Sequence, residues 1–267
     1  LLLHITSSFA SSHTVFAVSV AGTPTVGVQA VDLAANIDDL NLYGGTVTVT
    51  NGAVLPTVSG LELRIDASNP FGNLTVPADG TELGTWSDLS GLGNDVVQWL
   101  GAGRIPTWQE GDGTTIGNLP TVRFDGNDGS RSTTAFDNTY SIFTVSKLTG
   151  TENLRLITSG DMNNWLLGYW GGGEDRMYAG GWVNQTGSPA TTDPHMYIAT
   201  SNGAANTRFY DGDTDLTVNP APTLAIGRLG LGEWAGNLNN ESSAGDVSEV
   251  LVYDGVVSAA DRNAIGL

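Results

Sequence analysis

The chain has 267 residues, of which 40% are hydrophobic and 8% aromatic, so it is long enough and apolar enough to bury a folded core. It carries 28 acidic and 10 basic residues, and this net charge of −18 disfavours nucleic-acid and anionic-lipid partners, which require clustered Lys and Arg. The absence of cysteine excludes disulfides and Cys-based chemistry, and no apolar run is long enough for a membrane-spanning helix.

Residues 1–58 are predicted to form a β-rich N-terminal extension or partial domain. Segments 14–20, 26–33 and 46–50 have the composition of strands. The segment begins without Met or a basic region, so we expect the chain to be a processed or excised piece of a longer protein. Apolar β-rich segments pair readily with the edge strand of a neighbour, which makes residues 1–50 a candidate for self-assembly.

Residues 59–267 show short apolar strands separated by clusters of Gly, Asp and Asn, a pattern typical of an all-β sandwich. Strands are predicted at 61–66, 121–125, 142–147, 165–170, 196–200, 207–210, 224–226 and 247–253. Turns are predicted at 171–175, 211–215 and 237–246. The strand at 247–253 is apolar on both faces and is expected to be central. Ser258 and Asp261 resemble a capping box, which predicts a short C-terminal helix.

Three ordered blocks carry a resemblance to a known family. They are residues 61–68 followed by 85–98, residues 119–128, and residues 245–254 followed by 258–265. Together they resemble the laminin-G-like, concanavalin-A-like domains of bacterial surface and secreted proteins, over residues 60–267. The resemblance implies a two-sheet antiparallel jelly roll that serves as a spacer or adhesion module, or binds carbohydrate or protein, sometimes through calcium.

Aromatic residues are the best candidates for ligand contacts, because exposed rings can pack against sugar faces. They gather around the glycine-rich segment at 171–175, with one further ring in a later Gly-rich loop. The alternative is that these rings belong to the core. The candidate ligand-binding residues are Trp165, Tyr169, Trp170, Tyr178, Trp182 and Trp234.

Calcium is the predicted cofactor, because Asp and Asn oxygens suit this hard cation. One candidate set is Asp211, Asp213 and Asp215, whose spacing is similar to the start of an EF-hand loop without its later Gly and Glu. The other set is Asp125, Asp128 and Asp246. For both sets the alternative is ordinary turn capping.

The sequence predicts no enzyme. A glycosidase needs two carboxylates facing one site, and alternation places Asp246 and Glu249 on opposite faces of a strand. A Gly-x-Ser-x-Gly nucleophile motif is absent. The first functional prediction is a non-catalytic extracellular or cell-surface protein for adhesion or for assembly of a surface layer or filament. Its partners are then glycans or neighbouring subunits. The alternatives are a calcium-assisted, lectin-like carbohydrate-binding module and, third, a glycan-active enzyme.

Overall fold

The computed structural model describes residues 17–20, 47–50, 58–150, 154–234 and 241–266. The chain divides into two compact units, Leu1–Pro56 and Thr57–Leu267. In the first unit, β1 (Ala17–Val20) pairs antiparallel with β2 (Val47–Thr50). The strand predicted at 26–33 lies outside the described residues, as does most of the segment assigned to self-assembly.

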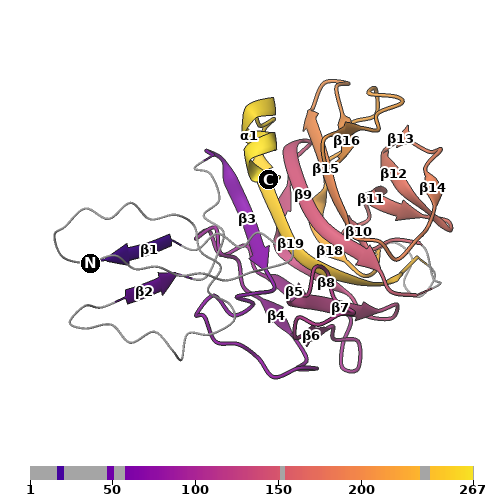
Figure 1. Ribbon diagram of the computed structural model, residues 1–267. Coiled ribbons are helices and arrows are strands. Elements are labelled where there is room, and N and C mark those ends of the chain that lie inside the picture. The colour runs from indigo at the N-terminus through magenta and orange to yellow at the C-terminus, as the bar shows by residue number, and fades with distance from the viewer. Residues whose placement is uncertain (1–16, 21–46, 51–57, 151–153, 235–240, 267) are drawn as a thin grey trace. The chain divides into compact units, whose positions relative to one another are not determined.

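The second unit contains two large antiparallel sheets (Figure 1). The strands of the first are β4 (Thr85–Trp86), β5 (Val96–Gln98), β8 (Ser130–Phe136), β10 (Ile157–Ser159), β11 (Trp165–Trp170), β12 (Gly173–Ala179), β13 (Trp182–Asn184), β14 (Ser188–Pro189) and β18 (Gly227–Leu231). This nine-stranded sheet has the order β13-β12-β11-β10-β18-β8-β5-β4, and β14 pairs with β12.

The strands of the second sheet are β3 (Leu61–Asp66), β6 (Thr107–Gln109), β7 (Thr121–Asp125), β9 (Thr139–Leu148), β15 (His195–Asn202), β16 (Arg208–Asp211), β17 (Thr214–Asp215) and β19 (Ala244–Asp254). This eight-stranded sheet has the order β17-β16-β15-β9-β19-β7-β6, and β3 pairs with β19.

Alternating side chains of both sheets meet in one hydrophobic core. Val250 and Val252 of β19 contribute from one sheet, and Leu167 and Leu229 from the other, all fully buried. The predicted all-β sandwich is therefore confirmed. The predicted C-terminal helix is also confirmed as α1 (Ala259–Ile265), whose N-cap Ser258 accepts a hydrogen bond from the backbone N–H of Asp261.

Strand β19 is central, as predicted, because it pairs with β3, β7 and β9. One detail of the prediction is wrong. A register shift between Val247 and Glu249 interrupts the alternation, so Val247 and Val250 both join the core. Asp246 and Glu249 therefore lie on the same face of β19 rather than on opposite faces.

Other assignments also differ from the prediction. Residues 224–226 precede a strand instead of forming one, and β18 starts at Gly227, whose φ of 68° marks the bend. The predicted turn at 171–175 is in part the strand β12, which is glycine-rich at its start. Within the described residues, we find no helix of the length and apolarity that crossing a membrane requires.

Candidate functional site

The rings on β11 divide between the core and the opposite face of the sheet. Trp165 and Tyr169 point into the core and are fully buried. The indole N–H of Trp165 donates to the Tyr140 hydroxyl at 2.9 Å, and burial raises the pKa of Tyr169. These two predicted ligand-binding residues are therefore core residues, because strand alternation turns them away from the surface.

The other predicted rings lie together on the opposite face. We define the aromatic platform as Trp170 at the end of β11, Tyr178 on β12, Trp182 on β13, and Trp234 after β18, all partly exposed. Tyr178 lies directly across the ladder from Trp182. Their rings meet edge to face, with centroids 5.2 Å apart.

A glycine of β11 allows the close approach of a core ring. Gly168 has a φ of 92°, and a Cβ there would come within 2.5 Å of the Tyr197 ring. The ladder between β11 and β12 shifts register between Gly168 and Trp170. The extra residue of this irregularity lies on β12, where Glu174 and Asp175 oppose Tyr169. The alternation of β11 itself places Tyr169 in the core and Trp170 on the platform.

Arg155 joins the rings of the platform, although it was not among the residues predicted from sequence. Its guanidinium carbon lies 4.3 Å from the centroid of the Trp234 ring and 5.0 Å from that of the Trp170 ring. Its Nε donates to the Glu241 carboxylate at 2.6 Å, and its Nη2 donates to the Asn164 side chain at 2.8 Å.

The same guanidinium is almost inaccessible, with its side chain 3% exposed. Burial lowers the pKa of Arg155, and the charge of Glu241 opposes that shift. An arginine remains protonated under either influence. Arg155 is therefore an internally compensated cation that holds the two indoles in place.

The platform borders a pocket of about 100 Å³. Its lining residues are Arg155, Asn164, Leu166, Trp170, Tyr178 and Trp182. The lining combines aromatic rings with polar side chains, among them the exposed Asn164.

In the predicted metal set Asp125, Asp128 and Asp246, the carboxylates have different partners. Asp246 is fully buried and forms a two-point ion pair with Arg123, at 2.8 and 2.9 Å. Asp128 accepts from the backbone N–H of Asp125, and Asp125 accepts from that of Asn127, so both cap their turn. Burial, together with the charge of Asp125, raises the pKa of Asp128 to about 6.

The predicted set Asp211, Asp213 and Asp215 is also divided. Asp213 is exposed, and Asp215 is exposed and accepts from the backbone N–H of Thr217 at 2.9 Å. Asp211 is half-buried and lies 2.8 Å from the Nδ1 of His195. Calcium binding by either set stays a prediction.

Glu249, which the bulge places on the same face as Asp246, pairs instead with Arg64 at 3.4 Å. Burial and the charge of Asp66 raise the pKa of Glu249 to about 7. Asp246 and Glu249 thus each form an ion pair with a different arginine, Arg123 and Arg64 respectively.

Comparison with solved structures identifies the sandwich but no family. The unit resembles domain 4 of AbnA, a GH43 extracellular arabinanase from Geobacillus stearothermophilus, solved in complex with arabinotriose. The TM-score is 0.55 at 15% identity, over 78% of this chain and 98% of that domain.

Two enzymes show the same likeness. Trypanosoma rangeli sialidase in complex with sialic acid has a TM-score of 0.51 at 13% identity, over 81% of this chain and 34% of the sialidase. A GH54 arabinofuranosidase has a TM-score of 0.50 at 15% identity, over 69% of this chain and 50% of the enzyme. This chain thus spans about a third to a half of those two enzymes. No protein-family model and no curated protein matches the sequence.

The matched structures share the two-sheet fold that the sequence resemblance implies. Membership of the laminin-G family stays a prediction. The matches correct the first functional prediction, because the three solved structures named above come from glycan-active enzymes rather than from adhesive or layer-forming proteins. The carbohydrate-binding alternative is the better supported one.

Proposed function

We propose that residues 57–267 form a carbohydrate-binding domain whose aromatic platform contacts a neutral glycan. The observation that carries the proposal is the gathering of Trp170, Tyr178 and Trp182 beside one pocket on the sheet face away from the core. Rings in such a place present large apolar faces at little conformational cost. The arabinotriose bound to domain 4 of the arabinanase, which has a similar fold, supports the same ligand class.

The charges favour a neutral ligand. A net charge of −18 repels uronic and sialic acids over the whole surface. Arg155 is the cation within the pocket lining, and its ion pair with Glu241 already compensates it. Neutral hydroxyls can use the exposed Asn164 amide without displacing that pair.

The proposal places the domain where polymeric glycans occur, outside the cell, either alone or beside a catalytic domain of a longer chain. The domain binds the glycan, and cleavage of the glycan would be the task of a separate catalytic domain. The glycan is the partner, and self-assembly through residues 1–50 stays a prediction.

The test is binding to a panel of neutral plant and microbial polysaccharides, with sialylated and uronic-acid glycans for comparison. Trp170→Ala and Trp182→Ala are each expected to weaken binding at least about tenfold, the usual effect of removing a central aromatic contact. Trp99→Ala is the matched control, because Arg131 lies over that indole at 4.8 Å but the ring is outside the pocket.

Thermal unfolding of each variant shows whether it is folded. Loss of binding in the two platform variants and retention in Trp99→Ala would support the proposal. Equal binding in all the variants, or binding to no neutral glycan, would refute it.

A further inference from the structure

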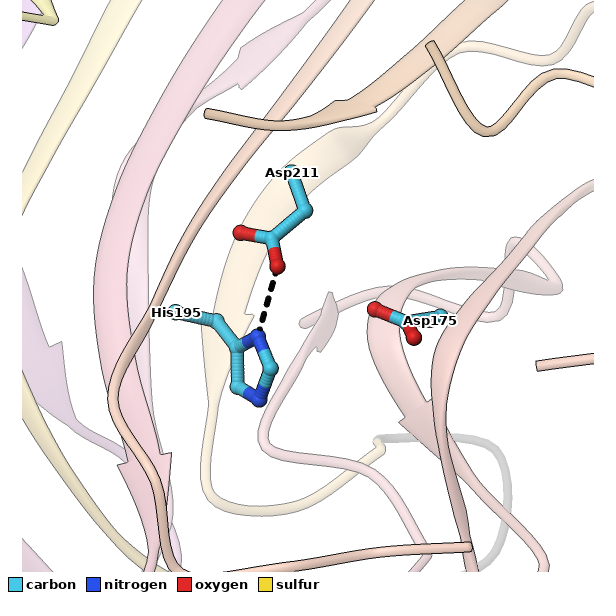
Figure 2. Close-up of side chains that lie close together, drawn as sticks. All are labelled: Asp175, His195 and Asp211. Carbon is cyan, nitrogen blue, oxygen red and sulfur yellow. Dashed lines mark hydrogen bonds and ion pairs between the residues drawn. The ribbon is translucent and has the colours of Figure 1, made fainter. Parts of the chain in front are cut away.

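Three side chains of a kind that binds metals converge from both sheets of the sandwich (Figure 2). Asp175 comes from β12 of the nine-stranded sheet, whereas His195 and Asp211 come from β15 and β16 of the eight-stranded sheet. One ligand atom from each lies within 4.8 Å of the others. One cation can therefore reach all three after small side-chain adjustments, since metal–ligand distances are about 2.0–2.2 Å for zinc.

The backbone at Asp175 holds an unusual conformation that aims its carboxylate at the group. Its φ is 61°, a left-handed value that costs a non-glycine residue of order 1 kcal/mol or more. The Tyr197 hydroxyl accepts from the Asp175 backbone N–H at 3.1 Å and donates to its carboxylate at 3.2 Å. The Asn184 side chain donates to the Asp175 carbonyl at 3.0 Å.

The imidazole of His195 is also held in a fixed orientation. Its ring stacks on Tyr197 with centroids 4.9 Å apart and planes 4° from parallel. Its Nδ1 lies 2.8 Å from the Asp211 carboxylate. The opposite nitrogen, Nε2, is buried without a hydrogen-bond partner and lies 3.4 Å from the carboxylate of Glu174.

The charges of the group are incompletely balanced. Three carboxylates, those of Glu174, Asp175 and Asp211, surround one imidazole. In the part of the chain that the structure describes, the ion pairs of Glu174 and Asp211 are with His195, and none of the three carboxylates pairs with Arg or Lys. Buried charges are stabilised by a counter-charge or by a metal ion, and a bound cation would balance this group.

We propose that Asp175, His195 and Asp211 bind a divalent transition-metal cation, best matched by Zn²⁺, which links β12 to β15 and β16. Imidazole and carboxylate together favour zinc, whereas calcium prefers six to eight oxygen ligands. A water completes the coordination. Glu174, beside Nε2, is a positioning residue that orients the ring in the manner of outer carboxylates at zinc sites.

The first test is titration calorimetry of the whole chain with Zn²⁺, and separately with Ca²⁺, after treatment with a chelator. We expect one saturable Zn²⁺ site per chain and an upward shift of the melting temperature of roughly 5–10 °C at a hundredfold excess over Kd. Co²⁺ bound at the same site is expected to give a visible absorption band, which disappears when Zn²⁺ displaces the Co²⁺.

Asp175→Asn and Asp211→Asn test the site, because Asn has the size of Asp and tolerates a left-handed φ. Each is expected to weaken Zn²⁺ binding by about 100-fold or more, and Glu174→Gln by about tenfold. Asp213→Asn is the matched control, an exposed aspartate on the same hairpin, and Zn²⁺ binding is expected to stay unchanged.

Three results would overturn the proposal. They are the absence of saturable Zn²⁺ binding, Zn²⁺ binding that the Asp175 and Asp211 variants leave intact, and a preference for Ca²⁺ at these residues. Zinc binding by Trp170→Ala is expected to equal that of the native chain, so the outcome is independent of the proposed glycan site.

Discussion

Two aspartates of the eight-stranded sheet show how a counter-charge decides what a carboxylate can do. The sequence predicts both Asp246 and Asp211 as metal ligands. Asp246 is fully buried, and Arg123 occupies both of its oxygens, with Lys147 4.0 Å away. Asp211 is 31% exposed and faces only the imidazole of His195 among the described ion pairs. The carboxylate of Asp246 is therefore neutralised by Arg123 within the fold, whereas that of Asp211 remains accessible to a cation.

The largest expected effect on the free energy of unfolding is at Asp246. Asp246→Ala leaves Arg123 and Lys147 facing each other without the carboxylate between them. Loss of one partner of a buried ion pair is expected to lower the free energy of unfolding by about 3 kcal/mol. Urea unfolding measures it, with the exposed Asp213→Ala as the control, expected within about 0.5 kcal/mol of the native chain. A loss below about 1 kcal/mol at Asp246 would show that the pair does little for the fold.

A smaller effect is expected at Gly168, which lies against Tyr197 near His195 and Asp211. Gly168→Ala strains a backbone with a φ of 92° and drives a Cβ to within 2.5 Å of the Tyr197 ring, the ring on which His195 stacks. We expect a loss of about 2 kcal/mol in unfolding free energy together with weaker zinc binding. Gly212→Ala, also at positive φ but with open space around it, is the control for strain alone. Equal effects of the two variants would show that the contact with Tyr197 has no part in the loss.

The smallest effect is in the titration of His195 without metal. Burial lowers the pKa of His195, but the hydrogen bond and charge of Asp211, with the charges of Glu174 and Asp175, outweigh it and raise the pKa above its usual value. The protonated form is thus favoured in the folded chain, so its stabilising contribution is complete at acidic pH and is lost as the pH rises through that raised pKa. NMR titration of the imidazole tests this, and Asp211→Asn is expected to lower the pKa. An unchanged pKa in that variant would contradict the assigned cause.

The strand pattern of the sandwich was readable from local sequence, and the site was readable only in part. Residues 165–170 form an apolar and aromatic run, broken by Gly168 and followed by three glycines, and this pattern predicts β11 with its observed bounds. Strand β12 was missed because its start has the glycines and acids of a turn, and because the left-handed Asp175 within it breaks any regular pattern.

The parts of the site that the sequence did not predict depend on partners far apart in the chain. Arg155 finds Glu241, 86 residues away, and Arg123 finds Asp246, 123 residues away, and no local pattern encodes either pair. The split of the rings into core and platform follows alternation for Trp165 and Trp170. It could not be anticipated for Tyr178 and Trp182, whose strands were not predicted.

The most direct test of the central claim is a crystal structure of the chain with a neutral oligosaccharide, arabinotriose first. The account predicts sugar rings packed on Trp170 or Trp182, with hydroxyls reaching the Asn164 amide and with the Arg155–Glu241 pair intact. An oligosaccharide bound away from the platform, with these rings uncovered, would contradict it.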